Sequence, residues 1–260
     1  MRIPFLHLNA FTTRLEGGNG AGVCPLERWL PARVMQRIAA ERGLAETAFF
    51  VPDKRGDFKI RWFSPAVEIN LCGHATLASA HVVFAYLGFR KRAVKFHSRS
   101  GPLTVFRDGR RLTLDFPSLP GQPYTPPKLL ARALGKRPRE VLRASDLLCV
   151  YDKESDVRAL APDFAMLARV NVRGVIVTAR GRKVDYVSRF FGPRVGIPED
   201  PATGSAHCML IPYWSRRLRR TKLTAYQASP RGAEFWCEDV GERVHISGHV
   251  REVLVGTLLL

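Results

Sequence analysis

Short segments with alternating polar and hydrophobic residues flank two longer segments that are apolar almost throughout. FKIRWFSP, residues 58–65, alternates aromatic with polar positions and ends in proline, which is typical of a β-strand. HATLASAHVVFAYLGF, residues 74–89, is small or apolar on nearly every side, and Gly88 is its expected C-terminal stop. A helix without a polar face must be buried all round. The pattern therefore predicts a helix enclosed by a curved sheet.

The same pattern returns 128 residues later. RWFSPAVEI begins at Arg61 and RFFGPRVGI at Arg189, and they agree at six of nine positions if Trp62 is matched to the aromatic Phe190. In this second copy, residues 184–193 are the expected strand and residues 199–214, EDPATGSAHCMLIPYW, the expected turn and buried helix. Pro212 should kink or shorten that helix. The repeat predicts two similar halves with a cleft between them that holds the active site.

Other segments fit this outline. Residues 31–43 form an amphipathic helix pattern, residues 100–120 predict a hairpin through Asp108-Gly109, and residues 242–260 predict closing strands. The proline-rich residues 122–130 are the expected linker. We place the halves at residues 1–118 and 119–260, with the last strands able to return to the first half.

The composition predicts a cytoplasmic protein. Of 260 residues 46% are hydrophobic, but no apolar run approaches the ~20 residues that span a bilayer, and no signal-peptide pattern is present. The five cysteines are odd in number and far apart, which favours free thiols in a reducing compartment. They are Cys24, Cys72, Cys149, Cys208 and Cys237.

The net charge of +18 has two interpretations. Clustered cations, as in residues 90–92 and 216–220, can bind nucleic acid through counterion release. They can equally form a solvated, arginine-rich surface. The clusters are dispersed and no zinc-finger or aromatic RNA-binding motif accompanies them, so we expect no nucleic-acid partner.

The starts of the two buried helices are candidate anion sites. Backbone N–H groups at a helix start lack internal partners and carry partial positive charge, and Gly73 and Gly204 allow a ligand to approach them closely. The alternative is simple capping, with Thr203 or Ser205 as the cap.

Several side chains in these segments could transfer protons. Glu46 lies among small and apolar residues, and burial would raise its pKa toward neutrality. His74 could contact a substrate or shuttle a proton, or it could cap the helix. Asp200 precedes a proline and could be structural, and Glu199 could equally be the functional acid. His81 and His207 fall inside apolar helices and are expected to be buried and satisfied.

Metal and nucleotide cofactors are not expected. Cys72, His74, His207 and Cys208 could converge if the halves face each other, but their spacings are unusual for zinc. The glycine-rich GGNGAG at residues 17–22 is neither a phosphate-binding loop nor a dinucleotide fingerprint.

At these residues the sequence resembles the PhzF-like family, cofactor-independent isomerases named for an enzyme of phenazine biosynthesis. The resemblance covers nearly the whole chain, and its most specific blocks are CGHAT at residue 72 and EDPATGSAH at residue 199. It implies the α+β fold of diaminopimelate epimerase: two pseudo-symmetric barrel-like halves, each wrapped around a central buried helix.

The resemblance also implies roles. Glu46 would be the acid/base, His74 would contact the substrate, and Asp200 would orient it. Substrate binding would fall to Asn19, Gly73, Gly204 and Ser205. The family enzyme shifts a double bond in a dihydro-hydroxyanthranilate. A small carboxylate substrate and a homodimer are expected on the same ground.

Departures from the family leave alternatives open. Related racemases use one cysteine on each face of the substrate carbon, but here Cys72 is matched by Ala202. Residues 15–20, LEGGNG, differ from the usual loop, so the substrate can differ from that of the family enzyme. An epimerase acting at one carbon and a non-catalytic binding protein, with nucleic acid as one candidate ligand, remain as alternatives.

Overall fold

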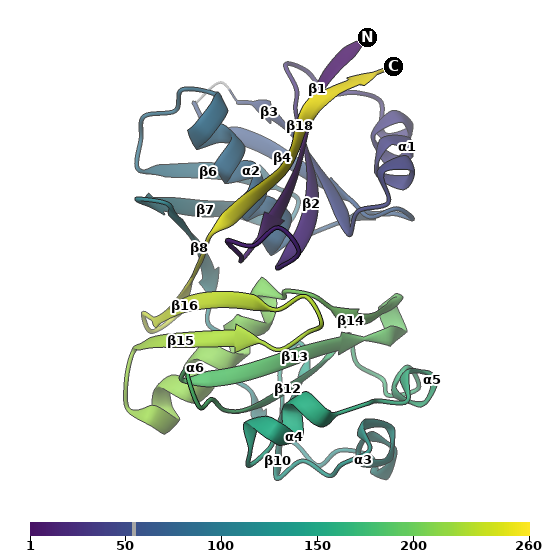
Figure 1. The fold of residues 1–260 in the computed structure, drawn as a ribbon, viewed down its shortest axis with the longest axis vertical. Helices are drawn as coiled ribbons and strands as arrows, with labels where there is room; N and C mark the ends of the chain where they lie inside the picture. The colour runs from purple at the N-terminus through teal and green to yellow at the C-terminus, as the bar shows by residue number, and fades with distance from the viewer. Residues whose placement is uncertain (54–55) are drawn as a thin grey trace. The chain divides into compact units, whose positions relative to one another are not determined.

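The structure, a computed structural model, describes residues 1–53 and 56–260 and has the α+β fold that the sequence predicts (Figure 1). The chain divides into two compact units. The first comprises Met1–Asp115 and Ser247–Leu260, and the second comprises Phe116–Ile246. The chain passes from one unit to the other within β8 (Arg111–Pro117) and back within β17 (Arg243–Gly248).

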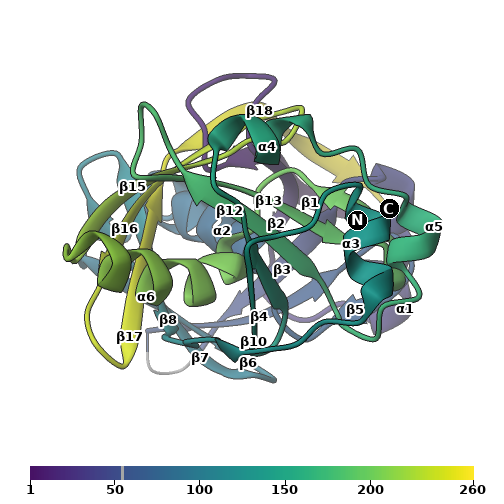
Figure 2. The ribbon, with the colours of Figure 1, turned by 90° about the horizontal axis from the view of Figure 1, so that it is seen from below.

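The first unit contains one mixed sheet, in the order β18-β1-β2-β3-β4-β6-β7-β8 with β5 paired to β4. Its strands are β1 (Arg2–Ala10), β2 (Asn19–Pro25), β3 (Glu46–Pro52), β4 (Phe58–Phe63), β5 (Glu68–Ile69), β6 (Ala93–Ser98), β7 (Gly101–Asp108), β8 and β18 (Val250–Leu259). Its helices are α1 (Ala32–Arg42) and α2 (Gly73–Tyr86). Figure 2 shows the two chain ends side by side, where β1 and β18 pair.

The second unit contains a sheet in the order β9-β10-β11-β12-β13-β15-β16, with β14 paired to β13. Its strands are β9 (Gln122–Pro123), β10 (Glu140–Arg143), β11 (Leu147–Val150), β12 (Val175–Arg180), β13 (Tyr186–Gly192), β14 (Ile197–Asp200), β15 (Lys222–Gln227) and β16 (Ala233–Asp239). Its helices are α3 (Lys128–Leu134), α4 (Glu154–Ala159), α5 (Phe164–Leu167) and α6 (His207–Leu218), with 3₁₀ turns η1 (Pro193–Val195) and η2 (Gly204–Ala206).

The strand pairings repeat from one unit to the other. In the first, β1–β2, β3–β4 and β6–β7 are antiparallel, whereas β2–β3 and β4–β6 are parallel. In the second, β10–β11, β12–β13 and β15–β16 are antiparallel, and β11–β12 and β13–β15 are parallel. Each parallel pair is joined through helical segments, as a crossover requires. The sequence repeat thus corresponds to a repeated topology.

The two helices with apolar surfaces are buried. Helix α2 contacts β1, β2, β3, β6 and β18, so strands of its unit surround it (Figures 1 and 2). Its residues 74–80 are all buried, and Gly88 follows its end with a φ of 63°. Helix α6 contacts β15 and β16, and its buried residues include Leu210 and Trp214. Burial, not local propensity, stabilises both helices.

A repeated ion pair explains much of the sequence repeat. The guanidinium of Arg61 in β4 donates two hydrogen bonds of 2.7 Å to Glu68 in β5 and lies 5.2 Å from the Phe63 ring centre. Arg189 in β13 donates bonds of 2.7 and 2.9 Å to Glu199 in β14 and lies 4.9 Å from the Phe191 ring. Each bidentate pair ties a strand to the segment that leads into the buried helix.

One local prediction was wrong, and a second was wrong in part. Residues 122–130, the expected linker, include β9 and the start of α3 within the second unit. The predicted shortening at Pro212 is wrong, because α6 continues to Leu218, whereas the predicted kink stays a prediction. A proline cannot donate to the carbonyl four residues earlier. That carbonyl, on Cys208, instead accepts a 2.9 Å hydrogen bond from the Leu119 N–H, so it keeps a hydrogen-bond partner.

The predicted hairpin and free thiols are confirmed. Asp108 pairs with Arg111, so the turn consists of Gly109, whose φ is 57°, and Arg110. All five cysteines are free and buried.

Several basic residues of the charged clusters form ion pairs at the surface. Arg217 pairs with Glu140 at 3.0 Å, and Arg220 pairs with Asp185 at 2.7 Å. These pairs favour the interpretation of a solvated surface. Among the helices of the described residues, none is long and apolar enough to cross a membrane.

Candidate active site

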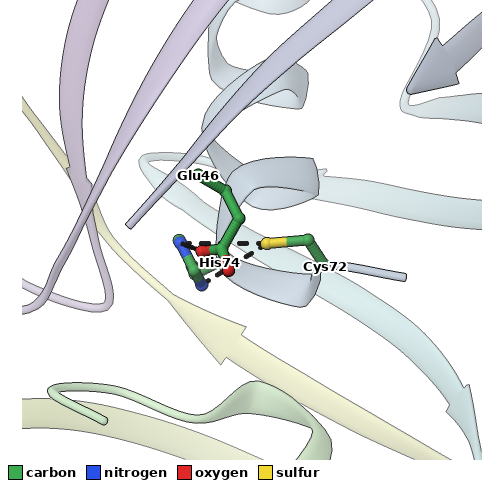
Figure 3. A group of neighbouring side chains, drawn as sticks. All are labelled: Glu46, Cys72 and His74. Carbon is green, nitrogen blue, oxygen red and sulfur yellow. Dashed lines mark hydrogen bonds and ion pairs between the residues drawn. The ribbon is translucent and has the colours of Figure 1, made fainter. Parts of the chain in front are cut away.

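Three elements of the first unit bring four polar residues together. Three of them, Glu46, Cys72 and His74, are drawn in Figure 3. Asn19 begins β2, and Glu46 begins the neighbouring β3, which pairs with β2 in parallel. Cys72 precedes α2, and His74 lies in its first turn. All four residues are buried, with exposed fractions between 1% and 8%. The cluster therefore depends on the crossover from β2 through α1 to β3 and on the start of α2.

The imidazole of His74 is the centre of the cluster. Its Nε2 lies 3.0 Å from the Glu46 Oε2, and its Nδ1 lies 3.3 Å from the Asn19 Nδ2. The Cys72 Sγ is 3.8 Å from Nε2 and 3.6 Å from Nδ1. Glu46 and Asn19 thus hold the ring from both nitrogens, which fixes its orientation.

The predicted rise of the Glu46 pKa is wrong in direction. Burial does raise it, but the charge of His74 and hydrogen bonds with His74 and Cys72 lower the pKa below its usual range. For His74, burial lowers the pKa, while Cys72 and Glu46 raise it well above the usual value. The pair is therefore an ionised carboxylate beside an imidazolium at neutral pH. Because both ring nitrogens of an imidazolium donate, the Asn19 amide must then turn its oxygen toward Nδ1. Sequence reasoning found both residues but not their contact.

Cys72 is a buried thiol at the start of α2. Burial raises its pKa, and the neighbouring Glu46 adds to that rise, whereas His74 and the Ala75 N–H act in the opposite direction. The thiol is therefore protonated at neutral pH. Glu46, Cys72 and His74 are also a possible metal-ligand set, with ligand atoms within 4.8 Å of one another.

In the second unit, the turn before α6 is held by a buried glutamine. The Gln227 side chain accepts a 2.8 Å hydrogen bond from the Thr203 N–H and donates one of 2.6 Å to the Asp200 carbonyl. Thr203 in turn donates from its hydroxyl to the Asp200 carboxylate. Glu199 is bound by Arg189, and its use as the functional acid stays a prediction. Asp200 braces the turn and stays a prediction as a site residue.

The predicted start of the second buried helix differs in detail. Gly204 and Ser205 form the 3₁₀ turn η2, and α6 begins only at His207. The Thr203 side chain makes no capping hydrogen bond. The functional use of Gly73, Gly204 and Ser205 stays a prediction.

The helical histidines differ from expectation. His81 is half-buried and lies 2.8 Å from Glu252. His207 is buried, and its Nδ1 lies 2.7 Å from the Tyr186 hydroxyl, but Nε2 is without a partner in the described part of the chain. Burial lowers the pKa of His207 to about 3, so this ring is neutral.

The fold is that of a class of isomerases and epimerases. A hydroxyproline epimerase from Agrobacterium vitis, only 11% identical, superposes with a TM-score of 0.60 over 99% of this chain and 92% of its own, which shows a shared fold. The chain belongs to the PhzC-PhzF family, described as phenazine biosynthesis-like protein, whose profile matches residues 8–256.

Two full-length similarities support this assignment. An uncharacterized isomerase of Pseudomonas aeruginosa is 50% identical over 100% of both chains. The crystal structure of a PhzF-family protein from Enterococcus faecalis is 43% identical, with a TM-score of 0.98 over 100% of both chains.

Proposed function

We propose that the protein is an isomerase that needs no cofactor and moves a proton between two carbons of a small carboxylate substrate, with Glu46 as the acid/base. The observation that carries this proposal is the buried Glu46 carboxylate 3.0 Å from the His74 Nε2, in a ring held by Asn19. Isomerase activity is supported at the level of the family and its relatives.

Glu46 is ionised before substrate binds, so it can accept a proton at neutral pH without prior activation. The imidazolium of His74 can stabilise the negative charge that develops on the substrate, or pass the proton on. Glu46 then returns the proton to a second carbon.

The paired state of Glu46 restricts the substrate. A carboxylate with a lowered pKa is a weak base, and the driving force for proton transfer falls accordingly. The C–H that it attacks must therefore be activated by a neighbouring carbonyl, carboxylate or conjugated double bond.

The remaining roles follow from the family resemblance. The backbone of Gly73 and Gly204 and the side chain of Ser205 would bind the substrate, and Asp200 would orient it. The buried first turn of α2 and the turn held by Gln227 are consistent with fixed positions for these groups. A cytoplasmic homodimer is part of the same proposal.

The test is proton NMR in D₂O with dihydro-hydroxyanthranilate and a panel of amino and cyclic carboxylic acids. Wild type should introduce deuterium into a carbon position, and Glu46→Gln should reduce the rate by about 10²–10⁴-fold, the usual contribution of an acid/base. Glu252→Gln is the matched control, because it removes the carboxylate of another Glu–His pair in the same unit, and it should leave the rate unchanged.

The position of the label separates isomerisation from epimerisation. Deuterium at a second carbon indicates isomerisation, and deuterium at the original carbon with inverted configuration indicates an epimerase. Exchange that survives in Glu46→Gln would refute the role of Glu46.

A further inference from the structure

In the candidate active site, the Glu46 carboxylate, the Cys72 thiol and the His74 imidazole lie close together. The Glu46 Oε2 lies 3.0 Å from the His74 Nε2, and the Cys72 Sγ lies 3.8 Å from the same nitrogen (Figure 3). All three ligand atoms lie within 4.8 Å of one another, and within residues 1–53 and 56–260 no other group of three such side chains does so. Oxygen, nitrogen and sulfur are the donors that zinc takes in proteins.

Two of the three ligand separations are close to those of a tetrahedral zinc ion, and the third, between the Cys72 sulfur and the Glu46 carboxylate, is within 4.8 Å. With bonds of about 2.3 Å to sulfur and about 2.0–2.1 Å to nitrogen and oxygen, a tetrahedral site separates sulfur from nitrogen by about 3.6 Å and nitrogen from oxygen by about 3.3 Å. The observed separations of 3.8 and 3.0 Å differ from these by a few tenths of an ångström. Small side-chain shifts would therefore complete three ligands and leave a fourth position open.

Asn19 would act as the outer partner of such a site. If Nε2 of His74 binds the metal, Nδ1 must carry the proton and donate it. The Asn19 amide lies 3.3 Å from that nitrogen, and a turn of the amide presents its oxygen as the acceptor. Outer partners of this kind orient metal-bound histidines.

We propose that Glu46, Cys72 and His74 bind Zn²⁺ reversibly and that the bound ion inhibits the enzyme. Binding displaces the Cys72 thiol proton and the His74 Nε2 proton into the solvent, so affinity should increase with pH. Inhibition rests on the proposed function, because a coordinated Glu46 carboxylate cannot accept a substrate proton. The binding itself does not depend on that function.

The chain contains a matched control pair. The Cys237 Sγ lies 3.6 Å from the His207 Nδ1, as close as Cys72 lies to His74, and both residues are buried. No acidic residue completes a ligand group with this pair among the described residues. Cys237→Ser should therefore leave metal binding unchanged, and the serine hydroxyl can still accept the hydrogen bond that Tyr186 gives to the sulfur.

The experiment is a titration of the metal-free, reduced full chain with Co²⁺ as a spectroscopic probe, followed by displacement with Zn²⁺. Wild type should saturate at one equivalent, with a thiolate-to-cobalt charge-transfer band and the d–d absorption of a tetrahedral ion. Cys72→Ser should lose the charge-transfer band and weaken Zn²⁺ binding by more than ~100-fold, beyond the ~10–100-fold that outer partners contribute. Asn19→Leu should fall within that ~10–100-fold range.

The proposal is overturned if wild type gives no saturable charge-transfer band, or if Cys72→Ser retains it. Circular dichroism checks the folding of each variant, and Glu46→Gln provides a second loss of a ligand if Cys72→Ser does not fold. Because no substrate is present, this result is independent of the deuterium exchange. If Glu46→Gln loses deuterium exchange but wild type does not bind cobalt, the zinc site is refuted and the proposed function is not.

Discussion

The two units each contain one bidentate Arg–Glu pair, formed by the matched arginines Arg61 and Arg189, and this allows the two pairs to be tested against each other. Glu199→Gln and Glu68→Gln each remove one negative charge with almost no change in shape. Arg189 and Glu199 have side chains that are 11% and 14% exposed, against 21% and 18% for Arg61 and Glu68. We therefore expect the two substitutions to differ in their effect on stability.

The size of the difference follows from what remains around each arginine. The Nη1 group of Arg189 also donates to the carbonyls of Val157 and Leu160, at 3.1 and 2.7 Å, so this guanidinium is fixed in place and cannot turn to water. A buried charge left without its partner costs about 3–5 kcal/mol. Arg61 can turn toward solvent, so Glu68→Gln should lower the free energy of unfolding by only about 1–2 kcal/mol.

Urea unfolding followed by circular dichroism measures both losses. With a slope near about 3 kcal/mol per molar urea, Glu199→Gln should lower the midpoint by about 1–2 M, and Glu68→Gln by about half a molar or less. Replacement of both partners, Arg189→Met with Glu199→Leu, should recover only part of the loss, because the two carbonyls then lack their donor. A midpoint for Glu199→Gln at or above that of Glu68→Gln would refute this account of the pairs.

Two further predictions concern the candidate site and the turn of the second unit. The pKa of His74, followed by NMR, should lie above that of free histidine and fall in Glu46→Gln. The lowered pKa of Glu46 stabilises the fold above about pH 4.3, and this contribution is lost as the pH falls below that value. The raised pKa of His74 stabilises the fold below about pH 6.5, and this contribution is lost as the pH rises above that value. The stability difference between wild type and Glu46→Gln should therefore be largest at about pH 5–6, and a difference that does not vary with pH would contradict the ion pair. Gln227→Leu should lower the free energy of unfolding by about 1–3 kcal/mol, because it leaves the buried Thr203 N–H without an acceptor; an unchanged urea midpoint would show that the turn does not depend on this side chain.

Much of the fold could be predicted because burial leaves a pattern in the sequence. The segment around α2 has no polar face, so only a position enclosed by strands suits it. The continuation of α6 beyond Pro212 could not be predicted, because it depends on the Leu119 N–H, a donor distant in sequence, reaching the Cys208 carbonyl. Long-range compensation of this kind leaves no local signal.

The candidate site could be predicted as a set of residues but not as an arrangement. Glu46 and His74 stand out by their apolar surroundings and by the family blocks. Their contact depends on the packing of α2 against β2 and β3, the parallel strands in which Ala21 pairs with Glu46, and a sequence does not display that packing. The direction of the Glu46 pKa was missed for the same reason, since the ring 3.0 Å away outweighs burial.

The register of the two sheets also shows how the copies have diverged. Thr47 pairs with Phe63 in the first unit, and Val175 pairs with Phe191 in the second. Because Phe63 and Phe191 are matched repeat positions, the residue that corresponds to Glu46 is Gly174.

A side chain at Gly174 would require Phe190 to move, because a Cβ there would lie 2.1 Å from the Phe190 ring. The second unit thus has no carboxylate at the place where the first carries Glu46. Each unit has a bidentate arginine–glutamate pair beside a phenylalanine, whereas the carboxylate of Glu46, the proposed acid/base, has no counterpart at Gly174. Two-base epimerisation needs a proton acceptor and a donor on opposite faces of one carbon, and a symmetric pair of acids would be the simplest source. The presence of a single such acid favours a mechanism in which Glu46 both takes the proton and returns it.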